Sequence, residues 1–430
     1  RWYAAARPGA IAWGNPIEQT PRAFYAARAL IALMAVCGNL DVPGGNIAAN
    51  EPKILGLGEF VRADRIPDKR REMIHAHHGA IPRLMTVPPA LFKEAVLTGH
   101  PYPVRGAYIQ CSNPVLTWAD TDSTRRALSA LDFLAVSDVF MTLTAALADV
   151  VLPAATGYEF DDIGHYGLGH GVLLARPKVV DPPADCRPDR EILWALGRMI
   201  TDPADWPAAP EHLLDAVVAP AGLTYAGFVE RGHLTGPERS RKYLEKGFRT
   251  PTGKVELTLS RADRFGLPAL PRGEVPPIDP DYPLLLTAAK DPHYLHSSYR
   301  WVDRLREKSP RPTARIHSET AAAWGVQDGG MMTIETRWGR IRQTNPAGSG
   351  AGRLRLVVSR GWSERRHGPG PGQLQPPHLG PGPGTGIRNP PVEGACLSDR
   401  SRHGKVVLDF RFMILDRGFT GSNQLPNNNY

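Results

Sequence analysis

Apolar residues in the first half of the chain fall into three short runs separated by helical patterns. The runs Ala107–Gln110, Phe133–Val136 and Val150–Leu152 are almost continuously apolar, which is typical of parallel strands covered on both faces. Between them, Asp122–Ala130 has helical spacing after a capping-type start, and Met141–Ala148 predicts a short helix. The order strand, helix, strand, helix, strand predicts an open parallel α/β sheet.

All three predicted strands end in small or hydrogen-bonding residues. Cys111-Ser112-Asn113 follows the first strand, Ser137-Asp138 the second and Pro153-Ala154 the third. Asn-Pro and Ser-Asp pairs also favour turns, so ordinary turn chemistry is one interpretation of each end. Three successive ends of this kind favour the other interpretation, a nucleotide pocket, because ligands of open parallel sheets gather beyond the carboxyl ends of the strands.

Asp138 supplies the carboxylate at these strand ends. The Watson–Crick edge of guanine offers two neighbouring donors, which one carboxylate can accept together, whereas adenine does not offer that pair. Asp138 is therefore predicted to select guanine. Asp149 stands at the start of the third strand instead, and we expect it to cap or pair locally.

Pattern and composition divide the rest of the chain. Residues 22–37 have the helical spacing of a buried helix, and short strands with Gly turns after residue 284 predict a small barrel. We expect a cofactor-binding α/β half-domain at 1–155, a return segment of strands and helices at 156–266, a linker at 267–283, the start of the barrel domain at 284–345, and a Gly/Pro-rich tail, aberrant or disordered, at 346–430.

Composition excludes some classes of protein. A length of 430 residues predicts two or three domains. The net charge of +8 is too small and too scattered to indicate a nucleic-acid partner, and no apolar run is long enough to predict a membrane span. The four cysteines show no CxxC spacing, which disfavours a soft-metal cluster within this chain. The start at Arg1, without Met or a signal pattern, predicts a piece of a longer protein, and no compartment follows from it.

A group of histidines, His75, His77 and His78, lies in a charged stretch without clear periodicity. It could supply metal ligands, but a solvated loop is the favoured interpretation, because no further oriented ligand stands nearby in the sequence. We therefore name no metal-binding residue in this chain.

Five segments in this order resemble the molybdopterin oxidoreductases of the dimethyl sulfoxide reductase family, over about residues 8–345. One departure is Cys111, which stands where glycine is usual in the family. The segments are Gly38-Asn39 with Pro43-Gly44-Gly45, Ser112-Asn113-Pro114, Leu131–Asp161, Phe248–Leu257 and Thr287–Ser297.

The resemblance implies a fold and a cofactor. The fold is α/β: the second half of a doubly wound parallel-sheet domain, followed by a small β-barrel-type molybdopterin-dinucleotide-binding domain that need not be complete. The cofactor is molybdenum or tungsten held by two molybdopterin guanine dinucleotides. The family's [4Fe-4S] motif, metal ligand and catalytic residues all precede the matched part, so this chain alone is expected to be inactive and we name no catalytic residue.

Cofactor-binding residues are carried over position by position from the same resemblance. Lys290 stands where arginine is commoner; it keeps the phosphate-attracting charge and loses the bidentate fork. The residues implied to contact the cofactor are Gln19, Ser112, Asn113, Thr117, Ser137, Asp138, Thr287, Lys290, His296 and Ser297. For His296 and the nearby His293, burial without cofactor contact remains an alternative.

The implied function is two-electron redox or oxygen-atom transfer on a small-molecule substrate, with an iron–sulfur electron-transfer subunit as partner. The segment Ala175–Val180 favours the thiosulfate or polysulfide reductase, formate dehydrogenase and acetylene hydratase branches. The alternative is a non-catalytic subunit of the same fold, as in the large iron–sulfur subunit of respiratory complex I. An unrelated nucleotide-binding α/β enzyme is disfavoured, because neither a G-x-G-x-x-G after a strand nor a P-loop is present.

The tail departs from the family pattern. More than half of the residues between Gly368 and Pro391 are Gly or Pro, a composition that does not favour strands. One hypothesis is a shift of the reading frame near residue 344, since shifted GC-rich codons yield Gly, Pro and Arg. A natural disordered tail is the alternative.

Overall fold

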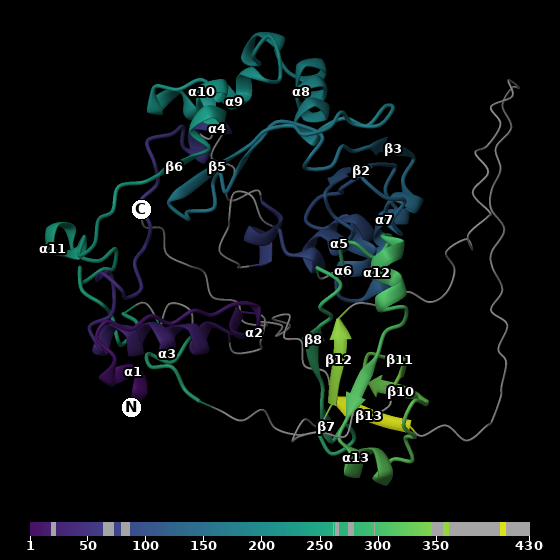
Figure 1. The fold of residues 1–430 in the computed structure, drawn as a ribbon. Coiled ribbons are helices and arrows are strands. Elements are labelled where there is room, and N and C mark those ends of the chain that lie inside the picture. The colour runs from purple at the N-terminus through teal and green to yellow at the C-terminus, as the bar shows by residue number, and fades with distance from the viewer. Residues whose placement is uncertain are drawn as a thin grey trace, which may run out of the picture. The chain divides into compact units, whose positions relative to one another are not determined.

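The chain forms two compact units, Arg1–Val275 and Pro276–Phe410 (Figure 1). The computed structural model describes residues 1–18, 23–62, 73–78, 87–260, 262, 266–273, 279–295, 297–345, 356–360 and 405–409. Within these ranges no single helix is long and apolar enough to cross a membrane, although the bent pair His212–Ala221 and Tyr225–Arg231 passes by length and composition.

The elements of the first unit are mostly short. Its helices are α1 (Trp2–Ala5), α2 (Asn15–Glu18), α3 (Ala23–Val36), α4 (Leu57–Phe60), η2 (Ile74–His78), α5 (Pro89–Thr98), α6 (Pro114–Thr117), α7 (Thr121–Ser129), η3 (Ala145–Leu147), α8 (Asp189–Ile200), η4 (Pro203–Asp205), α9 (His212–Val218), η5 (Ala219–Ala221), α10 (Tyr225–Arg231) and α11 (Tyr243–Lys246), where η marks a 3-10 helix. Its strands are β1 (Gly106–Gln110), β2 (Phe133–Asp138), β3 (Val150–Pro153), β4 (Asp162–Gly164), β5 (Val172–Arg176) and β6 (His233–Thr235).

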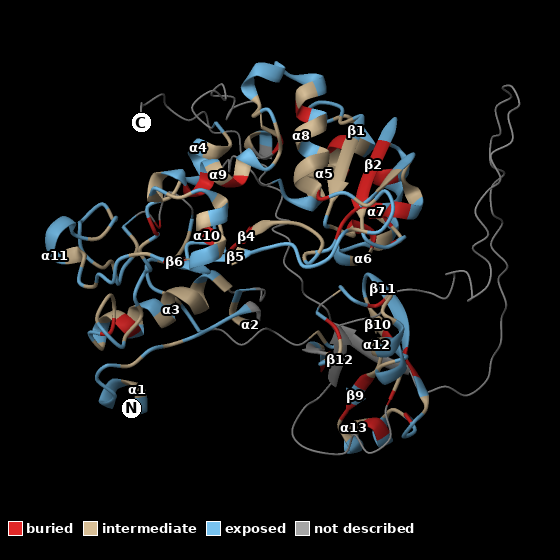
Figure 2. Cartoon of the chain, turned by 45° about the horizontal axis from the view of Figure 1, so that its top comes forward, coloured by how far each residue is buried: buried red, intermediate tan, exposed pale blue. Residues whose placement is uncertain are grey.

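Strands β1, β2 and β3 form a parallel sheet in that order, as the apolar runs predict. The central strand β2 is buried along most of its length, with Leu134 and Val136 almost completely covered (Figure 2). Their side chains pack with Val115, Leu128 and Ala145 into one apolar cluster. This burial explains why the strand reads as a continuous apolar run rather than an alternating one.

The helix predicted at Met141–Ala148 is mostly absent. Only the 3-10 helix η3 forms there, and the two threonines that precede it make side-chain hydrogen bonds. The Ala145 N–H donates to Thr142 Oγ1 at 3.2 Å, and the Thr144 hydroxyl donates to Asn113. Hydrophobic spacing does not reveal side-chain hydrogen bonds of this kind.

Asp149 pairs locally, as the sequence predicts. Its Oδ2 accepts a hydrogen bond from the Leu134 N–H at 2.7 Å, and its own N–H donates to the Leu134 carbonyl at 2.8 Å. This two-way clasp joins the start of β2 to the residue before β3.

A second, antiparallel sheet contains β4, β5 and β6 in that order. Leu173 of β5 is fully buried against Val218 and Phe228, from the region of α9 and α10. These helices are therefore the apolar cover of this sheet.

Helix α3 forms where it was predicted, but it is not buried. Met34 is its one buried residue, whereas Phe24 is 48% and Val36 68% exposed. The described residues cover this apolar helix on a single side, so the prediction of burial is wrong for this part of the chain.

The second unit is built from short strands. Its helices are α12 (Asp303–Lys308) and α13 (Ser318–Ala323), and its strands are β7 (Leu284–Leu285), β8 (Thr287–Lys290), β9 (Ala314–Ile316), β10 (Met331–Thr336), β11 (Gly339–Thr344), β12 (Leu356–Arg360) and β13 (Lys405–Asp409). They make two small sheets, with the orders β11-β10-β13-β7 and β8-β12-β9. A separate apolar core includes Ala314, Met332 and Ile334. Strands β12 and β13 come from the range expected to be a tail.

Candidate functional site

The carboxyl ends of the parallel strands lie along one edge of the sheet. The register pairs Gln110 of β1 with Ser137 of β2, and Asp138 of β2 with Pro153 of β3. The turn that contains Asn113 and the carboxylate of Asp138 therefore follow neighbouring strand ends at the same edge. We call this edge, from Cys111 to Asn113 and from Ser137 to Thr144, the strand-end loops.

Asp138 is half-buried, and its carboxylate is held by its own loop. Its Oδ1 accepts from the Val139 N–H at 2.8 Å, and its Oδ2 accepts from the Thr142 hydroxyl at 3.2 Å. Each carboxylate oxygen has more than one lone-pair site, so two bonds leave acceptor capacity for a ligand. The carboxylate is thus oriented without being saturated.

Asn113 is held from the same loop. Its Oδ1 accepts from the hydroxyl of Thr144 at 2.7 Å, and the Val115 N–H donates to that hydroxyl at 3.2 Å. The amide Nδ2 of Asn113 has no hydrogen-bond partner among the residues that the structure describes. The strand-end loops therefore contain a donor group, the amide of Asn113, and an acceptor group, the carboxylate of Asp138, that can both form further hydrogen bonds.

Asp189, at the start of α8, holds the strand ends together from another element. Its Oδ1 accepts from the hydroxyl of Ser137 at 2.6 Å, and its Oδ2 accepts from the thiol of Cys111 at 2.9 Å. Ser137 is completely buried. The structure thus commits the Ser137 hydroxyl to Asp189, and a role in orienting the loop follows from that geometry.

Sequence reasoning missed Asp189. The local signal, an acidic residue in the first turn of a helix after Pro188, marks a helix start and nothing more. Its partners precede it by 52 and 78 residues, and no periodicity links positions so far apart.

The surroundings of Cys111 favour the protonated form of its exposed thiol. Desolvation raises its pKa to about 12, with further contributions from the Asp189 carboxylate, which accepts its hydrogen bond, and from the charges of Asp189 and Asp138. The neighbouring Tyr108 hydroxyl also has a raised pKa, mainly because of burial. A thiol that stays protonated at neutral pH is a poor nucleophile and a poor metal ligand.

The backbone conformation at Cys111 is one that suits glycine. Its φ of 50° lies in the left-handed region, which glycine adopts at no steric cost. Cys111 adopts this conformation, and its thiol donates to Asp189.

The other predicted cofactor-binding residues of the first unit have different surroundings. Ser112 is half-buried in the turn, and the Thr117 hydroxyl donates to the Asn113 carbonyl at 3.1 Å within α6. Gln19 lies outside the described residues. Ile74–His78 forms a 3-10 helix, and no group of three or more His, Cys, Asp or Glu side chains in the described ranges could hold a metal ion.

In the second unit, the segment after β8 is organised around Asp291. Burial alone would raise the pKa of Asp291, but hydrogen bonds from Ser309 and from the backbone and ring of His293 outweigh it and lower that pKa. Thr287 is exposed and Ser297 is half-buried, whereas His296 and the side chain of Lys290 lie outside the described residues.

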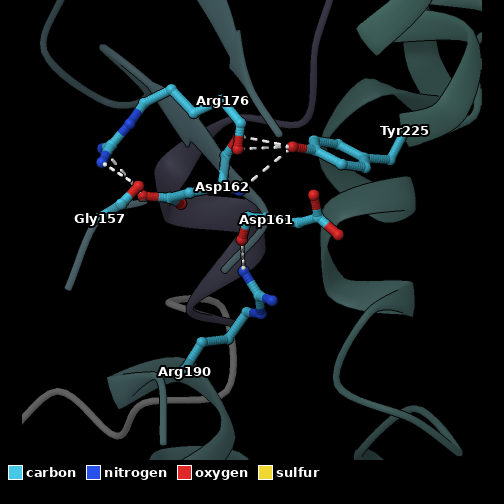
Figure 3. Close-up of polar contacts among 6 residues, drawn as sticks. All are labelled: Gly157, Asp161, Asp162, Arg176, Arg190 and Tyr225. Carbon is cyan, nitrogen blue, oxygen red and sulfur yellow. Dashed lines mark hydrogen bonds and ion pairs between the residues drawn. The ribbon is translucent and has the colours of Figure 1, made fainter. Parts of the chain in front are cut away.

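A second polar cluster lies beside β4 and β5, and its Tyr225 and Arg190 side chains bond to backbone groups of the protein. We call this cluster the Tyr225 joint. Figure 3 shows its members, Gly157, Asp161, Asp162, Arg176, Arg190 and Tyr225. The Tyr225 hydroxyl contacts the N–H and carbonyl of Asp162 and the carbonyl of Arg176, at 3.2, 3.0 and 3.0 Å. Arg190 Nη1 donates to the Asp161 carbonyl at 2.7 Å. Tyr225 thus bridges the backbones of β4 and β5, and Arg190 of α8 is bonded to the residue before β4.

Two family models match this chain. Residues 3–199 match molybdopterin oxidoreductase, and residues 284–385 match the molybdopterin dinucleotide binding domain. The chain therefore belongs to the molybdopterin oxidoreductase family, and the strand-end loops lie within the first match. The sequence resemblance to this family is confirmed.

Curated relatives and a solved structure agree with this assignment. The chain is similar to dopamine dehydroxylase from Eggerthella lenta (25% identical, 78% of this chain and 42% of the relative), acetylene hydratase from Syntrophotalea acetylenica (24%, 85% and 56%) and formate dehydrogenase H from Escherichia coli (26%, 79% and 49%). It spans about half the length of these proteins. Its fold matches the structure of acetylene hydratase from Pelobacter acetylenicus with a TM-score of 0.76 at 21% identity, over 83% of this chain and 54% of that one. The predicted fold class is confirmed.

Proposed function

We propose that this chain holds the dinucleotide ends of a molybdenum or tungsten cofactor in an oxidoreductase, and that Asp138 binds the guanine. The observation that carries the proposal is the acceptor capacity left on an oriented carboxylate at a strand end. The chemistry fits a guanine end, because two neighbouring N–H donors of the base match the two oxygens of one carboxylate.

Each predicted cofactor-binding residue then has a proposed role. Asp138 accepts from the base, Asn113 supplies a donor beside it, and Ser112 and Thr117 border the same turn. Ser137 acts through Asp189 and keeps the two strand ends together. Gln19, Thr287, Lys290, His296 and Ser297 remain proposed contacts of the pterin and of the dinucleotide. When bound, the cofactor supplies two-electron redox or oxygen-atom transfer.

The complete protein is proposed to act on a small-molecule substrate. Its relatives include the F420-dependent formate dehydrogenase subunit alpha of Methanocaldococcus jannaschii, which is 30% identical over 251 residues. The designation "subunit alpha" supports an electron-transfer partner subunit, for which we propose an iron–sulfur protein. A [4Fe-4S] cluster is proposed for the part of the protein that the relatives have beyond this chain.

The test is nucleotide binding by the 430-residue chain. Calorimetry should find that GMP binds more tightly than AMP or CMP. Asp138→Asn should weaken GMP binding about 10- to 100-fold, because hydrogen bonds to a charged group contribute roughly 1.5–3 kcal/mol.

The matched control is Asp132→Asn. Asp132 lies at the other end of β2 and pairs with Arg105 at an exposed site, so GMP binding should not change. Equal affinity for GMP and AMP, or an undiminished Asp138→Asn variant, would overturn the proposal. Absence of GMP and molybdenum from the complete protein would instead favour the alternative function, a non-catalytic scaffold subunit.

A further inference from the structure

Thr144 is completely buried, so its hydroxyl serves other residues and not a ligand directly. The Val115 N–H donates to this hydroxyl at 3.2 Å, and the hydroxyl lies 2.7 Å from Asn113 Oδ1. The backbone N–H can only donate, so Thr144 accepts from Val115, and its own proton is donated to the amide oxygen of Asn113.

This arrangement fixes the direction of the Asn113 amide. A flipped amide would turn its NH₂ group toward Thr144 and remove the acceptor that the buried hydroxyl proton has among the described residues. Burying an unsatisfied donor is unfavourable, so the unflipped amide is retained. Asn113 then directs its two N–H donors away from Thr144.

We infer that Thr144 is a positioning residue that makes Asn113 a hydrogen-bond donor beside the acceptors of Asp138. The inference rests on the proposed function and deepens it. A donor next to two acceptors complements the Watson–Crick edge of guanine, which presents the O6 acceptor followed by the N1 and N2 donors. Asp138 reads the two donors of the base, and Asn113, set by Thr144, reads O6.

Two nucleotide probes separate these contacts. In 6-thio-GMP a sulfur atom, a weak acceptor, replaces O6, whereas IMP keeps O6 and N1–H but lacks the N2 amine. The wild-type chain should prefer GMP over each of them roughly tenfold, the equivalent of one lost hydrogen bond.

Thr144→Val keeps the shape of the side chain and removes the hydroxyl. It should abolish the preference for GMP over 6-thio-GMP and leave the preference over IMP intact. Thr144→Ser, which restores the hydroxyl, should restore the preference for GMP over 6-thio-GMP. Asp138→Asn should lose the preference over IMP. The matched control is Thr124→Val, since Thr124 is equally buried and donates to the Asp120 carbonyl at 2.9 Å within α7.

The outcomes are distinguishable. If the wild-type chain does not bind GMP, the proposed function fails. If it binds GMP and Thr144→Val keeps full discrimination against 6-thio-GMP, the proposed function stands and the role of Thr144 is wrong. If circular dichroism shows that Thr144→Val does not fold, Asn113→Asp decides, because it keeps the side-chain shape without the donors. Retained preference over 6-thio-GMP in that variant would overturn the inference.

Discussion

The strand-end loops and the Tyr225 joint are both clusters of polar side chains beside a sheet, and they differ in what is left over. At the joint, the Tyr225 hydroxyl meets three backbone groups, which uses its donor and its acceptor capacity. At the strand ends, Asp138 and Asn113 are each held by a threonine; the carboxylate of Asp138 retains acceptor capacity, and the amide N–H donors of Asn113 have no partner among the described residues. Remaining capacity on an oriented group, rather than the number of polar residues, therefore distinguishes the proposed binding site from the Tyr225 joint.

The largest expected effect comes from breaking the joint. Tyr225→Phe should destabilise the first unit by about 1–3 kcal/mol, because the Asp162 N–H and two carbonyls lose their partner in a half-buried setting. Urea unfolding followed by tryptophan fluorescence measures the change. GMP affinity should stay at the wild-type value. A stable variant with weakened GMP binding would reverse the roles of the two clusters.

A smaller effect is expected at Cys111. Cys111→Val should destabilise the chain by about 1–2 kcal/mol, since a β-branched side chain is strained at a φ of 50°. Cys111→Gly should remain within about 1 kcal/mol of the wild type, because glycine relieves the backbone while the bond to Asp189 is lost. Thermal unfolding of the two variants measures the difference in stability between them. Equal destabilisation by Val and Gly would show that the backbone conformation does not determine which residues this position tolerates.

The smallest expected effect is a change in the reactivity of the Cys111 thiol. Asp189→Asn removes the negative charge that helps raise the pKa of Cys111, so the thiolate fraction at pH 8.5 should increase. Alkylation of the Cys111 peptide by iodoacetamide, followed by mass spectrometry, should become faster than in the wild type. The peptide of Cys186, which is also a free cysteine, is the internal control. An unchanged rate at Cys111 would mean that Asp189 does not govern the thiol.

The raised pKa also sets a pH dependence. Below the ordinary thiol pKa near 9, the folded and unfolded forms are both protonated, and the contribution of Cys111 to stability is fully present. As pH rises from about 9 to 12, the unfolded chain releases its proton first, so this contribution is lost progressively. Asp189→Asn should narrow that window.

Features that depend on residues close together in the sequence could be predicted, and features that depend on residues far apart in the sequence could not. The strands β1, β2 and β3 follow from local apolar runs, and Asp149 follows from its place beside one of them. The helix expected after Asp138 is mostly absent; there Thr142 bonds to Asp138 and Thr144 bonds to Asn113, and hydrophobic spacing carries no information on such bonds. Asp189 could not be found for the same reason, since only the fold brings it to Ser137 and Cys111.

The clasp between Asp149 and Leu134 has a consequence for how this region can evolve. It pins the entrance of β3 to the start of β2, so an added or deleted residue in the intervening connection would be absorbed as a change in loop shape instead of sliding one strand past the other. Changes in the length of residues 139–148 are therefore expected to alter the loop while the pairing of β2 with β3 is kept.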